Sequence, residues 1–124
     1  MMDAVKNLIY NTKIVDIGSE AQDFKSVNML IFFGNEAPDA LRSSCFIIDV
    51  KPLKQDIEVG QTLKIGDTEY KITAVGNEVN RNLNNLGHMA VKFTGETEAG
   101  MPGSIYVEDN GFPQIEKGTE VAIY

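Results

Sequence analysis

The residue best suited to chemistry in this sequence is its one histidine. His88 is the only histidine among 124 residues, and imidazole is the only side chain whose ordinary pKa, about 6.5, lies near neutrality. A histidine that carries a phosphoryl group needs a free ring nitrogen and donors for the phosphate oxygens. Lys92, expected on the same strand face, is a candidate donor. The alternative is a histidine that only hydrogen-bonds to backbone where a helix meets a strand.

The one cysteine is a second candidate. Cys45 precedes the apolar run 46–48, a setting that raises the pKa of a thiol and favours a small buried hydrophobe over a reactive group. A single cysteine forms no internal disulfide, and no second Cys or His lies beside it to bind zinc. The carboxylates are dispersed, and the glycines do not form a phosphate-binding loop. We therefore expect no metal and no cofactor.

A helix followed directly by a strand is expected to position His88. Apolar residues at 79, 83 and 86 lie at i, i+4 and i+7, which predicts one short amphipathic helix over about residues 77–86. Gly87 suits the left-handed residue that ends a helix. In residues 88–93 apolar and other side chains alternate, which predicts a strand with His88 and Lys92 on its accessible face.

The rest of the chain predicts short strands. Apolar or alternating runs separated by Gly, Pro, Asn and Asp predict an all-β sandwich or small barrel of about eight strands. They cover residues 8–17, 29–33, 45–50, 62–65, 68–75, 88–93, 104–107 and 119–124. Gly66 and Asp67 predict a two-residue hairpin turn. Residues 19–25 predict a short helix with Ser19 and Gln22 as its capping box, and residues 40–42 a helical turn.

Composition excludes several classes of protein. Length and a hydrophobic fraction of 43% predict a single soluble domain over residues 1–124. A net charge of −7 with scattered basic residues disfavours nucleic-acid binding. The N-terminus MMDAVKNLIY lacks a basic segment leading into an apolar stretch, and the longest apolar run, 29–33, is too short to span a bilayer. We expect a cytoplasmic protein without membrane insertion.

Several strings together resemble a known family. They are AVG at 74–76, NLNNLGHMAVKF at 82–93, MPGSIYV at 101–107, CFI at 45–47 and EAP at 36–38. With them the chain resembles the glucitol/sorbitol-specific IIA component of the bacterial phosphoenolpyruvate-dependent sugar phosphotransferase system. The resemblance runs from about residue 9 to the last strand.

The resemblance implies a phosphoryl carrier with an all-β fold, a small closed or partly closed barrel. Such a carrier receives a phosphoryl group on histidine from the histidine-containing phosphocarrier protein. It passes the group to a cysteine on a IIB domain of the membrane transporter. Exposed strand edges in a small barrel are compatible with a homodimer.

The family's acceptor position differs in this chain. In the family pattern the phosphorylated histidine directly follows CFI, where this sequence has Ile48 and then Asp49. Isoleucine has no nucleophile, and it shares an apolar strand row with Phe46 and Val50, expected to lie in the core. Two hypotheses follow: His88, in the matching LGH string, is the acceptor, or the chain is a non-catalytic regulatory or binding module that lost its acceptor. A third is Cys45 as acceptor, in the manner of IIB domains.

Overall fold

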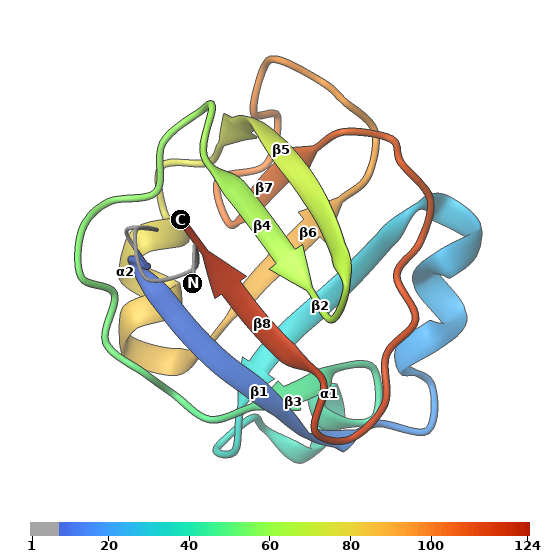
Figure 1. Ribbon diagram of the computed structural model, residues 1–124. Helices are drawn as coiled ribbons and strands as arrows, with labels where there is room; N and C mark the ends of the chain where they lie inside the picture. The colour runs from blue at the N-terminus through green and yellow to red at the C-terminus, as the bar shows by residue number, and fades with distance from the viewer. Residues whose placement is uncertain (1–7) are drawn as a thin grey trace.

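Eight short strands close into a barrel in the computed structural model, which describes residues 8–124 (Figure 1). Residues 1–7, in which we expect no targeting signal, lie outside the described part. The elements in chain order are β1 (Tyr10–Ile17), the 3-10 helix η2 (Ala21–Val27), β2 (Met29–Gly34), α1 (Asp39–Arg42), β3 (Phe46–Ile48), β4 (Thr62–Ile65), β5 (Thr68–Val75), α2 (Val79–Leu86), β6 (Met89–Lys92), β7 (Ser104–Val107) and β8 (Glu120–Ile123).

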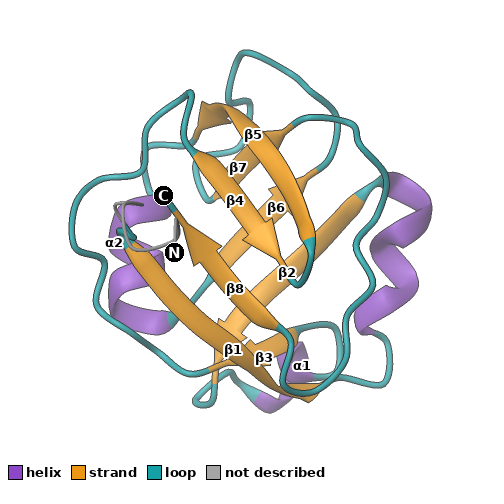
Figure 2. Cartoon of the chain, in the orientation of Figure 1, coloured by secondary structure: helices purple, strands orange, loops and turns teal. Residues whose placement is uncertain are grey.

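The strands form a closed mixed barrel, which confirms the predicted small barrel. Their order is β1-β3-β2-β6-β7-β5-β4-β8, and β8 pairs with β1 to close the ring. The β2/β3 and β6/β7 pairs are parallel. Figure 2 shows the helices outside the strands, with α2 and η2 on opposite sides of the barrel. The homodimer was expected from free strand edges, and the closed barrel has none within residues 8–124. The homodimer therefore stays a prediction.

The barrel interior holds the main hydrophobic core. In β6 and just after it, Met89, Val91 and Phe93 belong to this core, as the alternation predicted. Leu30 and Phe32 of β2 face them across the β2/β6 pair, where Leu30 is opposite Val91 and Phe32 opposite Met89. The intervening residues of both strands therefore lie on the outside of the barrel.

A second, smaller cluster lies on that outside face. It consists of Phe33, Ala37, Cys45 and Ile47, with Val15 and Ile31 packed against it. We call it the outer cluster. It joins β2 and β3 to the segment 35–45, which connects them and contains α1. The outer cluster thus gives the β2 end of the barrel a packed layer on both faces of the sheet.

The hairpin turn and the helix end form as predicted. Gly66 has φ +60° between β4 and β5, where Ile65 pairs with Thr68. Gly87 has φ +71° directly after α2, and its N–H donates to the Leu83 carbonyl. Both positions need the left-handed backbone that glycine adopts readily.

Other local predictions need correction. The capping box of Ser19 and Gln22 is wrong: η2 begins later, with Glu20 at its N-cap position and no side-chain cap hydrogen bond. Helix α2 begins at Val79, two residues after the expected start. Val50 was expected in the core, but β3 ends at Ile48, and Val50 is 45% exposed. Within residues 8–124, no helix is long and apolar enough to cross a membrane.

Candidate functional site

His88 lies on the outer face of the barrel, at the junction of α2 and β6. Phe32 and Met89 form the last pair of the β2/β6 ladder, and both point into the core. The next residues along each strand, Phe33 and His88, therefore face outward beside each other. Their rings stack with centroids 4.3 Å apart and planes inclined by 14°. This confirms the prediction that the His88 side chain points away from the barrel core.

The imidazole is half-buried, and its nitrogens remain available. Neither ring nitrogen hydrogen-bonds to any residue in the described range 8–124. Burial lowers the His88 pKa below its ordinary value, because removing water disfavours the charged imidazolium. The ring is therefore neutral at neutral pH and keeps one unprotonated nitrogen. That nitrogen has the lone pair that a nucleophile requires.

The end of α2 fixes the backbone of His88. Its N–H donates to the Asn82 carbonyl, six residues earlier in the chain, at 3.2 Å. Gly87 and Gly34 approach so closely that a Cβ on Gly87 would lie 3.0 Å from the Gly34 nitrogen. A Cβ on Gly34 would clash with the Val50 side chain and the Leu86 carbonyl. The ends of β2 and α2 therefore meet beside His88 without room for a side chain.

Two exposed apolar side chains flank this contact. Val50 is 45% exposed and Leu86 is 48% exposed. Leu86 was expected on the buried face of α2; as the last residue of the helix, it packs its carbonyl rather than its side chain against Gly34. Together with His88, these residues give this part of the surface an apolar character.

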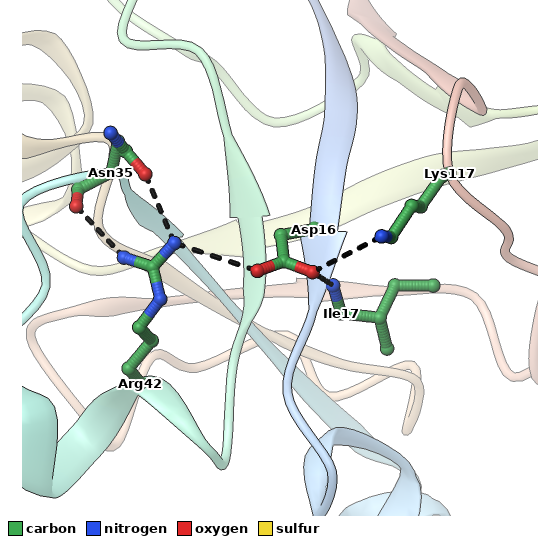
Figure 3. Close-up of polar contacts among 5 residues, drawn as sticks. All are labelled: Asp16, Ile17, Asn35, Arg42 and Lys117. Carbon is green, nitrogen blue, oxygen red and sulfur yellow. Dashed lines mark hydrogen bonds and ion pairs between the residues drawn. The ribbon is translucent and has the colours of Figure 1, made fainter.

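The segment that follows Phe33 is clamped by a polar network (Figure 3). Arg42 donates to the Asn35 carbonyl at 2.8 Å and to Asn35 Oδ1 at 3.0 Å. The Asp16 carboxylate lies 3.6 Å from both Arg42 Nη2 and Lys117 Nζ. It also accepts the Ile17 N–H, the main cause of its lowered pKa. The network ties the 35–42 segment to β1 and to the turn before β8.

Lys92 and His88 share a strand face, as predicted, but lie apart. They stand four residues apart, a strand rise of about 13 Å. The Lys92 ammonium lies 5.9 Å from the centre of the Tyr106 ring. The structure therefore does not bring the two side chains together, and Lys92 as a phosphate-binding residue stays a prediction.

The other candidate positions are buried. Ile48 is fully buried in the barrel core. Cys45 lies in the outer cluster, donates its thiol to the Leu41 carbonyl, and has a pKa raised by burial. Among residues 8–124, no group of three His, Cys, Asp or Glu side chains could hold a metal ion.

Sequence reasoning missed the stacking of Phe33 on His88 and the exposure of Val50 and Leu86 at the adjoining contact between Gly34 and Gly87. Phe33 was assigned to a strand, but its contact with His88 depends on the pairing of β2 with β6, elements separated by more than fifty residues of sequence. The outward position of Phe33 could have been inferred by continuing the alternation of that strand. That His88 is its neighbour could not be inferred in this way.

Comparisons with known proteins identify the family of the chain and agree with the barrel fold. The family model for the PTS system glucitol/sorbitol-specific IIA component matches residues 9–122. The glucitol/sorbitol-specific EIIA components of Shigella flexneri and Escherichia coli K12 are each 40% identical to the chain over 100 residues, covering 81% of both chains. The crystal structure of a PTS system IIA component from Enterococcus faecalis V583 superposes with a TM-score of 0.81 at 31% identity, covering 90% of this chain and 97% of that one.

The fold and these matches together show that the chain is a IIA component of the sugar phosphotransferase system. Within that class, the chain belongs to the glucitol/sorbitol-specific IIA family, whose members are phosphoryl-relay proteins in sugar uptake.

Proposed function

We propose that this protein carries the relayed phosphoryl group on His88. The observation that carries the proposal is the environment of the only imidazole in the sequence. It lies on the outer face, half-exposed, with neither ring nitrogen bonded to a residue within 8–124. Ile48, at the family's usual acceptor position, is buried and has no nucleophile. His88 is therefore the side chain that combines a nucleophilic nitrogen with access from solvent.

The chemistry is two successive phosphoryl transfers. In the first, the lone pair of a neutral His88 nitrogen attacks the phosphorus of a phosphohistidine on the phosphocarrier protein. The new P–N bond forms as the donor's P–N bond breaks, and the donor imidazole takes back the electron pair. In the second, a IIB cysteine thiolate attacks the phosphorus on His88, and His88 recovers its lone pair. Such steps need positioning and charge stabilisation more than covalent chemistry from the protein.

Lys92 is the proposed source of positive charge for the phosphate oxygens. Its ammonium rests near the Tyr106 ring, and a cation at this distance from an aromatic face is weakly held at a partly exposed site. To reach a phosphoryl group on His88, the Lys92 ammonium would have to move away from Tyr106 and along β6. The partners are the phosphocarrier protein and a IIB domain, which meet the protein in the cytoplasm. Both approach His88 across the surface that contains Val50 and Leu86.

A reconstituted relay tests the proposal. Purified protein is incubated with phosphoenolpyruvate, enzyme I and the phosphocarrier protein, and its intact mass is measured at neutral pH. We expect one acid-labile phosphate on the wild type and none on His88→Asn, which keeps a polar planar side chain. Lys92→Gln is expected to lower the transfer rate and leave the site of modification unchanged. Phosphate on the His88→Asn variant would overturn the proposal.

The second candidate is a regulatory or binding module without phosphoryl transfer. The buried Ile48 favours it, because the family's acceptor position is occupied by a core side chain. This hypothesis predicts a folded wild type that takes up no phosphate while an active control carrier in the same tube does. It also predicts that the protein still binds the phosphocarrier protein or the IIB domain.

A further inference from the structure

The stacked pair of Phe33 and His88 points to a role for Phe33 in the relay. We propose that Phe33 is a positioning residue that holds the His88 ring in one plane, with both nitrogens directed away from the aromatic face. The proposal rests on His88 being the phosphoryl acceptor. A phosphoryl group joins an imidazole nitrogen in the plane of the ring. A parallel neighbour at 4.3 Å therefore covers one face of the imidazole without covering either nitrogen.

Phe33 is a rigid support because its surroundings fix it. Its side chain is only 8% exposed and belongs to the outer cluster with Cys45 and Ile47. Ile47 is its partner in the parallel β2/β3 ladder. With this packing behind it, the phenyl ring cannot turn without opening the outer cluster.

The segment after Phe33 is held in place as well. The Ala37 N–H donates to the Gly34 carbonyl at 3.0 Å, which closes a turn directly after β2. Arg42 then holds both oxygens of Asn35, as Figure 3 shows. The Asp16 carboxylate pairs with the same guanidinium. A set of contacts therefore runs from Asp16 of β1 through Arg42 to Asn35, which lies in the turn that begins at Gly34, directly after Phe33.

His88 needs such a support because its own bonds fix only its backbone. The helix end holds its N–H on the Asn82 carbonyl, but rotation about χ2 of an imidazole is otherwise broad. No residue in the described range holds the ring by a hydrogen bond. The Phe33 face is the contact that selects one orientation, and a preoriented nucleophile reacts faster than a freely turning one.

The surrounding charges do not supply this orientation. The charged residues on the elements and connections around His88 are Glu36, Asp39, Arg42, Asp49, Lys51, Lys54, Asp56, Glu58, Glu78, Arg81 and Lys92. Glu78 pairs with Arg81, Arg42 with Asp16, and Lys92 lies over Tyr106. Burial, rather than a charged neighbour, is the cause of the lowered His88 pKa.

The test compares Phe33→Leu with Phe33→Tyr, using Phe112→Leu as the control. Leucine removes the aromatic face, tyrosine keeps it, and Phe112 is a half-buried aromatic that packs on Phe93, away from His88. Two quantities are measured: the rate of phosphoryl transfer to the protein, and the imidazole NMR signals. These signals report His88 alone, because the sequence has no other histidine.

We expect Phe33→Leu to transfer phosphate about ten-fold more slowly. Its His88 ring-proton signals should move downfield as they lose the shielding of the phenyl ring, and its His88 pKa should rise toward the ordinary value. Phe33→Tyr and Phe112→Leu should keep the wild-type rate and signals. If Phe33→Leu does not fold, Phe33→Met provides the same comparison with a flexible side chain of similar volume.

The outcomes separate this proposal from the one on which it rests. A wild type that takes up phosphate, with an unchanged rate in Phe33→Leu, overturns the role of Phe33 alone. Imidazole signals that do not move in Phe33→Leu also overturn it, because they show no stacking in solution. A folded wild type that takes up no phosphate overturns the acceptor assignment, and the role of Phe33 falls with it.

Discussion

At the scale of single residues, His88 combines partial burial with access. Its pKa is lowered because the ring is half-buried beside Phe33, and its nitrogens bond to no residue between 8 and 124. A fully exposed imidazole would be partly protonated at neutral pH, and a fully buried one could not meet a partner protein. Half-burial gives a neutral nucleophile that a second protein can still reach.

The lowered pKa has a consequence for stability that can be measured. Because the folded-state pKa of His88 lies below the unfolded value of about 6.5, the unfolded chain binds more protons between these two values. The free energy of unfolding should therefore fall as the pH drops through about 6.5, and this loss should stop below the folded-state pKa. Urea unfolding across this pH range checks the prediction, with His88→Asn as control. An equal pH dependence in both proteins would contradict it.

Ile48 illustrates how burial decides which position can carry chemistry. It is fully buried and packs in the barrel core. We expect Ile48→His to lower the free energy of unfolding by about 2–5 kcal/mol, because it places a polar ring among apolar side chains. Ile48→Val, the conservative control, should cost about 1 kcal/mol. Chemical denaturation measures both, and a stable Ile48→His protein that takes up a phosphoryl group at residue 48 would refute this account of the position.

At the scale of elements, α2 is packed on the barrel by its apolar face and is bonded to the connection between β3 and β4 by two side-chain amides. Val79 and Leu83 are its buried residues. On another side of the helix, Asn80 Oδ1 accepts the Ile57 N–H and Asn84 Oδ1 accepts the Leu53 N–H, each at 2.9 Å. These bonds tie the connection between β3 and β4 to the helix that ends at His88.

Removing these amides should loosen that connection. Asn80→Ala and Asn84→Ala should each lower the free energy of unfolding by about 1 kcal/mol, because a backbone N–H loses its acceptor. Amide hydrogen exchange should become faster at Ile57 in the first variant and at Leu53 in the second. Asn77→Ala, at an exposed position before α2, is the control. Unchanged protection at both amides would show that the hydrogen bonds do not hold the connection.

The sequence predicted elements whose signals are local. Gly66 and Gly87 marked their turns, and the alternation from His88 to Phe93 placed His88 outside the core. Prediction from the sequence failed where contacts between residues far apart in the chain determine the structure. The neighbour of His88 is Phe33 because β2 pairs with β6, and Val50 is exposed because β3 ends at Ile48. Ser19 and Gln22 had the capping pattern, yet η2 begins after Glu20.

At the scale of the whole molecule, the barrel brings distant segments to one place. The end of β2, the end of α2 and the start of β6 meet at His88, and the β1/β8 pair joins the first and last strands to close the ring (Figure 1). Each strand has a partner on both sides, so no strand can leave without breaking two ladders. This mutual support favours cooperative unfolding.

The expected result is a single unfolding transition for the whole chain. The ordinary enthalpy per residue gives about 87 kcal/mol near 60 °C for 124 residues. Scanning calorimetry should find this value equal to the van't Hoff enthalpy. Two resolved transitions, or a van't Hoff enthalpy well below the calorimetric one, would contradict a single cooperative domain.

The central claim is that the relayed phosphoryl group is carried on a ring nitrogen of His88. The most direct measurement is ³¹P and ¹⁵N NMR of the ¹⁵N-labelled protein after incubation with phosphoenolpyruvate, enzyme I and the phosphocarrier protein. We predict a phosphohistidine ³¹P signal together with a shift of one His88 ring nitrogen, both lost in acid. A folded protein whose His88 nitrogens do not shift, or whose phosphate lies on another side chain such as Cys45, would contradict the account.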